Sequence, residues 1–207
     1  MTQEATIVKG DAGHTRRTQS ERRAQTRAAL IAAGRDLFTE RGFAGAGREE
    51  IVERAGLTRG ALYHHFASKE ELFAVVYEEI EREVTEAVVV AAVVTSDPVE
   101  GLRLGAFAFL DAASMPDVRR VVLLDGPAVL SAEVRHDIAL RYGLGLVLEA
   151  LRAAEAAGRL VVGPVDLLAP VLLAALHEAA TSIADGADAA GMRAVVESLL
   201  NAITTKQ

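Results

Sequence analysis

The stretch IVERAGLTRGALYHHF, residues 51–66, predicts two short helices joined by a tight turn. The first helix is expected over 48–55, with its apolar residues on one face, and the second from Thr58 through Phe66. Between them, Gly56 is free to take a positive φ that reverses the chain, and Thr58 is suited to cap the free N–H groups of the second helix. Two short helices around a three-residue turn with a glycine are typical of a helix-turn-helix motif.

Longer helices are expected on both sides of this motif. Before it, apolar positions recur at helical spacing between an N-cap at Ser20 and a glycine stop at Gly42. After it, Ser68 and Glu71 predict a capping box at the start of a helix of about 25 residues. Residues 1–19 have no hydrophobic period and are interpreted as a flexible arm, either a plain tail or one that tracks DNA phosphates.

Three stretches carry a resemblance to a known family, namely Gly42-Phe43, the motif at 51–66 and the sequence SKEEL at 68–72. In order, spacing and capping box they closely resemble the TetR (tetracycline-repressor-like) family of transcriptional regulators, over about residues 22–75. The resemblance implies a DNA-binding head, a helical body that binds an effector, and a homodimer that reads a palindromic operator in double-stranded DNA.

One departure from the family pattern lies at the start of the first short helix. The family usually has a threonine followed by serine or threonine there, whereas this chain has Ala46 and Gly47. A hydroxyl contact to phosphate is therefore missing. Gly47 can still serve as an N-cap, and the exposed N–H groups of a helix start can bind phosphate without any side chain.

The start of the second short helix holds the candidates for reading bases, because that end enters the major groove first. Arg59 has the planar fork that pairs with guanine O6 and N7, while the small Gly60 and Ala61 permit close approach or a methyl contact with thymine. The alternative for Arg59 is a phosphate clamp or a solvated charge. A guanine in each half-site is predicted.

The resemblance places Tyr63, His65 and Lys69 where family members hold phosphates, and His64 where a side chain reaches either backbone or base. For Tyr63 and His65 the alternative is packing against the preceding helix, which is compatible with a phosphate contact from the polar tip. The predicted DNA-binding residues are Gly47, Arg48, Thr58, Arg59, Gly60, Ala61, Tyr63, His64, His65 and Lys69.

The chain beyond the motif predicts a larger helical body. Breaks rich in Gly, Pro and Asp delimit helices near 98–114, 116–124, 131–157, 166–184 and 188–203. Pro170 is expected either in the first turn of a helix capped by Asp166 or just before a helix that begins later.

The last two helices carry more apolar surface than a terminal pair needs for packing within one chain. In the resemblance, such helices form a four-helix dimer interface. The alternative is an ordinary core helix and its cover. The residues concerned are Ala174, Ala175, Ala179, Ala180, Ile183, Val195, Val196, Leu199 and Leu200.

The middle helices are expected to enclose a small-molecule effector, as the resemblance implies. Their aliphatic composition favours an apolar or amphipathic effector over a sugar or nucleotide. Each candidate has packing in the core as its alternative role. The candidates are Phe107, Phe109, Met115, Leu123, His136, Tyr142 and His177.

The distribution of charge supports a nucleic-acid partner at one end only. Residues 1–66 carry 11 Lys/Arg and 8 Asp/Glu, whereas the rest carries 11 Lys/Arg and 21 Asp/Glu. An acidic body is repelled by DNA phosphates, so the basic front is the expected contact. The absence of cysteine excludes disulfides and thiolate metal sites and fits a cytoplasmic setting.

The helix-forming composition predicts an all-α fold, with an arm at 1–19, a helix-turn-helix head at 20–66 and an effector-binding and dimerisation domain at 67–207. The expected function is sequence-specific transcriptional regulation, as a repressor that an effector releases. Two alternatives are a ligand-independent architectural DNA-binding protein and a helical small-molecule enzyme. No catalytic motif, metal ligand spacing or cofactor fingerprint is found. The longest apolar run, 87–94, is too short for a membrane span of about 20 residues.

Overall fold

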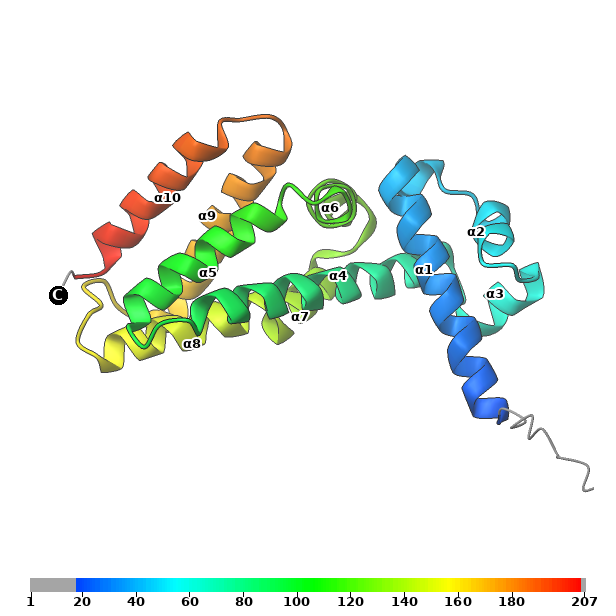
Figure 1. Cartoon of the computed structure of the whole chain (residues 1–207), viewed down its shortest axis with the longest axis horizontal. Helices are drawn as coiled ribbons and strands as arrows, with labels where there is room; N and C mark the ends of the chain where they lie inside the picture. The colour runs from blue at the N-terminus through cyan, green and yellow to red at the C-terminus, as the bar shows by residue number, and fades with distance from the viewer. Residues whose placement is uncertain (1–17, 206–207) are drawn as a thin grey trace, which may run out of the picture.

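The computed structural model describes residues 18–205, which form a small head and an elongated helical body (Figure 1). The head consists of α1 (Gln19–Gly45), α2 (Arg48–Arg54) and α3 (Arg59–His65). The body consists of α4 (Lys69–Ala92), α5 (Pro98–Ala112), the π-helix η1 (Val118–Asp125), α6 (Gly126–Val129), α7 (Ala132–Arg141), α8 (Gly143–Ala156), α9 (Val165–Ala184) and α10 (Ala189–Ile203). Apart from one bridge between Leu160 and Thr204, this part of the chain is built from helices, so the all-α class is confirmed.

Helix α1 begins before the predicted cap. Thr18, not Ser20, is the N-cap: its hydroxyl accepts from the N–H of Glu21 at 3.2 Å, and the Glu21 carboxylate accepts from the N–H of Thr18 at 2.7 Å. This reciprocal capping box satisfies two N–H donors at the helix start. A cap at Ser20 could not form such a box, because the residue three positions later is not a glutamate. The arm expected at 1–19 therefore gives its last residue to the helix, and residues 1–17 lie outside the described part.

The turn of the helix-turn-helix motif forms as its sequence predicts. Gly56 has a φ of +65° and joins α2 to α3. Thr58 occupies the N-cap position of α3, but its side chain makes no capping hydrogen bond, which corrects the expected role of its hydroxyl. Ser68 does cap α4 by accepting from the N–H of Glu71 at 3.1 Å, while the Glu71 carboxylate returns to the N–H of Ala67 at 2.6 Å.

The body differs from the predicted helices at three places. The helix expected over 131–157 is two helices, because Tyr142 has a φ of −119° and a ψ of −94° that end α7 and start α8. The segment expected over 116–124 is the π-helix η1, followed directly by the single turn α6. Pro170 is the sixth residue of α9, inside its second turn, so neither predicted placement holds.

A cluster of three phenylalanines joins the head to the body. Phe38 and Phe43 come from the end of α1, and Phe73 comes from the first turns of α4. The Phe73 ring centroid lies 5.2 Å from each of the other two, in edge-to-face geometry. Phe73 is fully buried. Helix α4 then runs on into the body (Figure 1), so this cluster packs the end of α1 against the helix that links the head to the body.

Helix α9 has the length and composition of a membrane-crossing helix, with a mean hydropathy of 1.6 over its most apolar window, of which a third is buried. In the structure it packs against α8, α5 and η1. Its buried side carries Ala169, Leu172 and Leu176, whereas Leu167 and Val171 are exposed on the other side. The apolar composition of α9 thus covers the core on one side and leaves an apolar stripe on the opposite side.

Candidate nucleic-acid interface and internal cavity

Helix α3 presents an exposed face made of predicted DNA-binding residues. Arg59, Gly60, Tyr63 and His64 are exposed, as is Thr58 just before them. The opposite face carries Leu62, which is buried together with Phe66 in the core of the head. Ala61 is half-buried at the edge of the exposed face. The alternation follows from the helical period, because residues three or four apart share a side.

Two arginines converge on the phenol of Tyr63. Arg48, the first residue of α2, donates to the Tyr63 hydroxyl at 3.4 Å, and the Arg59 guanidinium lies 5.9 Å from the centre of the Tyr63 ring. Hydrogen bonding from Arg59 and then Arg48 lowers the pKa of Tyr63. Arg59 also lies 3.4 Å from a carboxylate oxygen of Glu49. That pair is highly exposed, so it is weak and leaves the guanidinium available to a stronger anion.

The two histidines at the end of α3 differ in environment. His64 is exposed, whereas His65 is half-buried, and their rings make an edge-to-face contact with centroids 5.3 Å apart. Burial, followed by the charges of His64, Arg23 and Arg27, lowers the pKa of His65. The lowered pKa favours the neutral ring, which offers a single N–H donor.

Lys69, predicted to hold a phosphate, is turned inward. Its ammonium donates to the carbonyl oxygens of Phe43 at 2.7 Å and Ala46 at 3.0 Å, and lies 4.1 Å from the centre of the Phe43 ring. These contacts tie the loop after α1 to the start of α4. A phosphate contact from this residue would have to share the ammonium with both carbonyls.

The structure explains one residue of the unusual Ala46-Gly47 pair, namely the alanine. Ala46 is fully buried, where a threonine hydroxyl would need a partner. Gly47 is the N-cap of α2, as predicted, and its own N–H donates to the Glu50 carboxylate at 3.2 Å. That amide is therefore occupied within the helix start.

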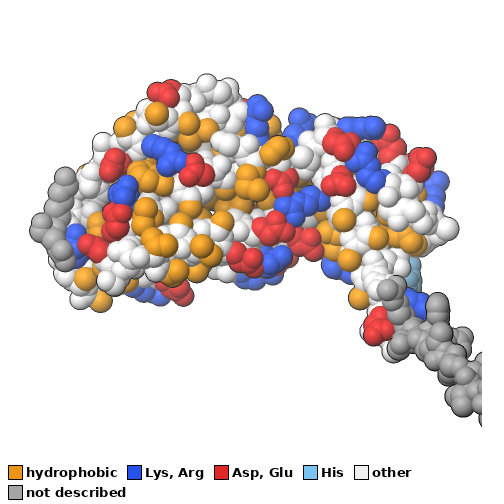
Figure 2. Space-filling view, in the orientation of Figure 1, with side chains coloured by type: hydrophobic (Ala, Val, Ile, Leu, Met, Phe, Trp, Pro, Cys, Tyr) orange, Lys and Arg blue, Asp and Glu red, His pale blue; other side chains and the backbone are white. Residues whose placement is uncertain are grey.

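Two ion pairs connect α1 with α2 on the head. Arg54 forms a two-pronged bond with Glu40, at 2.6 and 3.0 Å, and Arg41 pairs with Glu50. Figure 2 shows the result as intermixed Lys/Arg and Asp/Glu on the head, while hydrophobic side chains gather on the body. The exposed, weakly paired Arg59 of α3 therefore differs from Arg41 and Arg54, which connect α1 with α2.

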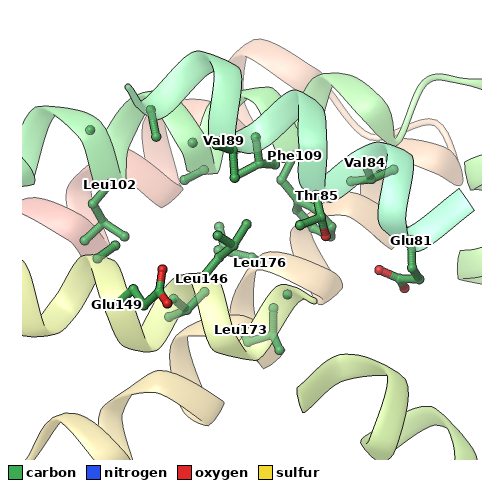
Figure 3. Close-up of a pocket in the computed structure, with 18 of the residues that line it drawn as sticks. Glu81, Val84, Thr85, Val89, Leu102, Phe109, Leu146, Glu149, Leu173 and Leu176 are labelled. Atoms are coloured by element: carbon green, nitrogen blue, oxygen red, sulfur yellow. The ribbon is translucent and has the colours of Figure 1, made fainter. Parts of the chain in front are cut away.

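A cavity of about 270 Å³ lies in the body between α4, α5, α8 and α9 (Figure 3). Its walls are mainly aliphatic, and Phe109 and His177 face it among the residues predicted for an effector. Their rings contact edge to face at 5.1 Å, and Nδ1 of His177 lies 3.1 Å from the carbonyl oxygen of Leu173. Sequence reasoning missed Glu81, because its place in α4 looks like an ordinary surface heptad position and its surroundings come from distant helices.

A second, more polar cavity of about 500 Å³ adjoins the first. Leu123, His136 and His177 from the predicted set line it, and Glu81 and His177 belong to both cavities. The other three predicted residues line neither cavity: Met115 is 49% exposed, Phe107 packs against Arg103 and Arg193, and Tyr142 donates to Glu78 at 3.2 Å.

The head is bonded to the body through both ends of η1. Arg35 of α1 makes paired bonds to Glu83 of α4 at 2.8 and 2.7 Å and bonds to Asp117, just before η1, at 3.0 and 2.5 Å. At the other end, Asp125 accepts from the N–H of Phe43 at 2.6 Å. These bonds couple α1 to the segment that carries Leu123 into the second cavity.

Comparison with known proteins covers both parts of the chain. Residues 30–76 match the family of bacterial regulatory proteins described as tetR, and residues 99–205 match a tetracyclin repressor-like C-terminal domain. The crystal structure of a TetR-family transcriptional regulator from Pectobacterium atrosepticum is 33% identical, with a TM-score of 0.78, over 92% of this chain and 99% of that one.

Two curated relatives match over shorter stretches. The transcriptional activator FasR of Mycolicibacterium smegmatis is 36% identical over 103 residues, which are 50% of this chain and 47% of FasR. The regulator CymR of Pseudomonas putida is 41% identical over 71 residues, which are 34% of this chain and 35% of CymR. The matched stretches thus span less than half the length of these relatives.

Proposed function

Since this chain belongs to the TetR family of DNA-binding transcriptional regulators, we propose that it is a cytoplasmic repressor that binds a palindromic operator as a homodimer and is released by a small apolar or amphipathic effector. The family and its named relatives are regulators and not enzymes, as the sequence predicted. The observation that carries the proposal is the exposed face of α3, where Arg59, Tyr63 and His64 are free to meet DNA.

Homodimer formation is supported by apolar stripes on the two last helices. On α9, Leu167 and Val171 are exposed four residues apart, and on α10, Val195 and Leu199 repeat that spacing. Two such stripes on neighbouring helices offer a self-complementary surface, which a two-fold axis pairs with its copy. Dimerisation also supplies the second reading head, because one helix-turn-helix contacts too few base pairs for strong specific binding.

Placing a charge in this stripe tests the dimer. The Val171→Glu variant is expected to be monomeric and to lose most of its operator affinity, because a carboxylate buried opposite its own copy has no partner. Light scattering gives the mass and fluorescence anisotropy the affinity. Val90→Glu is the matched control, since Val90 on α4 is 67% exposed and Val171 is 66% exposed. A dimeric Val171→Glu protein would contradict the proposed interface.

Coupling between cavity and head is proposed to run through two elements. Helix α4 carries Glu81, Val84 and Val88 along the cavity and begins at the head. The η1 segment joins the second cavity to α1 through Asp117 and Asp125. An effector that binds one body conformation better than the other shifts the equilibrium between them, and with it the separation of the two heads. The free energy of this shift cannot exceed the difference between the effector's binding free energies for the two conformations.

Binding to the DNA that flanks the gene tests the proposed function. The purified dimer is expected to bind that DNA at least about a thousandfold more tightly than random duplex at equal salt. Equal affinity for both duplexes would favour the architectural alternative and overturn the proposal. A footprint that disappears on addition of a compound identifies that compound as an effector. If binding of the protein to the promoter raises transcription, the protein is an activator and not a repressor.

A further inference from the structure

The chemistry of the first cavity is set by an apolar wall with a carboxylate near each end. Figure 3 shows Glu81 of α4 and Glu149 of α8 at opposite ends, with Phe109 and Leu146 among the side chains between them and Leu102 near Glu149. Thr85 adds a hydroxyl near the Glu81 end. The volume of about 270 Å³ lies just below the usual range of roughly 300–1,000 Å³ for ligand pockets, so a small molecule is the fitting occupant.

The lining of this cavity contains no lysine or arginine. Its ionisable members are Glu81, Glu149 and His177. In a space walled by aliphatic side chains, the interaction between charges is stronger than in water. Ionised Glu81 or Glu149 would repel a carboxylate or phosphate on the ligand, whereas either carboxylate would attract an ammonium.

Glu81 is the more telling of the two carboxylates because it is buried. Its residue is only 7% exposed, and within residues 18–205 no lysine or arginine pairs with it. The groups that face it are the Tyr77 hydroxyl from its own helix and the His177 ring from α9. Burial raises the pKa of Glu81. A raised pKa favours the neutral acid in the empty cavity, and an ammonium placed beside Glu81 would favour the carboxylate form and pair with it.

We propose that the effector is a small hydrophobic amine, whose ammonium lies beside Glu81 and whose apolar body fills the space walled by α4, α5, α8 and α9. The inference rests on the proposed effector response, and it names the chemical class that the site takes. Glu149, exposed at the opposite end, carries a carboxylate that attracts the same cation. The ring of Phe109, in contact with His177, offers an aromatic surface that also favours a cation.

Three ligands with the same eight-carbon chain separate the charge from the apolar body. Octylammonium, 1-octanol and octanoate are titrated into the DNA-free dimer by isothermal calorimetry. Octylammonium is expected to bind at least tenfold more tightly than octanoate, with octanol between them. The proposal would be overturned if octanoate bound as tightly as octylammonium. It would also be overturned if octylammonium showed no saturable binding at millimolar concentration.

The Glu81→Gln variant assigns the effect to one side chain. It keeps the size and hydrogen-bonding capacity of the residue and removes its charge. It is expected to lose at least tenfold in affinity for octylammonium and to keep the wild-type affinity for octanol, which also reports that the cavity is intact. Unchanged affinity for octylammonium would refute the role of Glu81. Glu149→Gln, at the exposed end, is expected to change the affinity less.

The binding experiment is independent of operator recognition. Because it uses protein without DNA, a negative result for octylammonium leaves the affinity for the flanking DNA as measured. Conversely, if the dimer binds octylammonium as expected but does not bind the flanking DNA specifically, the proposed ligand class is supported and the proposed regulatory function is rejected.

Discussion

The Arg59→Ala variant is expected to bind its operator at least about thirtyfold more weakly than the wild type. A bidentate pair between arginine and guanine contributes about 1–3 kcal/mol of discrimination, and a symmetric dimer loses one pair in each half-site. Arg59 stands at the start of α3, exposed and held only by the open pair with Glu49. Removing the Arg59 side chain is therefore expected to change the stability of the protein little. Fluorescence anisotropy with operator duplex measures the loss of DNA affinity.

The comparison with random duplex separates base reading from phosphate holding. If Arg59 reads a guanine, Arg59→Ala loses affinity for the operator and changes its affinity for random duplex little. A phosphate clamp would instead lower both affinities alike and reduce the salt slope by about two, one for each protomer of the dimer. Arg82→Ala is the control, because it removes the same charge from the exposed side of α4, where Arg82 pairs with Glu86. Equal losses in Arg59→Ala and Arg82→Ala would reject a direct DNA contact.

Phe73→Ala is expected to reduce the free energy of unfolding by about 3–5 kcal/mol, the usual cost of truncating a buried phenylalanine. The Phe73 ring is fully buried and contacts the rings of Phe38 and Phe43, so its removal leaves a void at the junction of head and body. Urea unfolding at a fixed protomer concentration measures the change, because the stability of a dimer depends on concentration.

The operator affinity of Phe73→Ala under native conditions is expected to fall as well, since the cluster packs α1 against α4 at the junction of head and body. Leu140→Ala provides the comparison: Leu140 is 46% exposed, and its truncation is expected to change stability by no more than about 0.5 kcal/mol. A loss below about 1 kcal/mol for Phe73→Ala would mean that the junction closes around the void.

The helix-turn-helix motif was predictable because its signals are local. Gly56 reverses the chain through its own φ, Ser68 caps the helix that follows it, and the spacing between them is short. Where prediction failed, a stronger neighbour or a distant contact decided the outcome. Thr18 displaced Ser20 as a cap because Glu21 completes a box with it. The phosphate contact of Lys69 stays a prediction, and the bonds of its ammonium to two carbonyls arise only when the head folds.

The amino-acid sequence by itself determined the helical class, the reading head and its resemblance to a family of regulators. Periodicity, capping and turn chemistry act over a few residues and can be read along the chain. The tertiary structure alone decided which ionisable groups meet: it brought Glu81 and His177 together from α4 and α9, and Arg35 against Glu83 and Asp117. These contacts join residues dozens of positions apart, and their strength depends on burial that arises only when the helices pack.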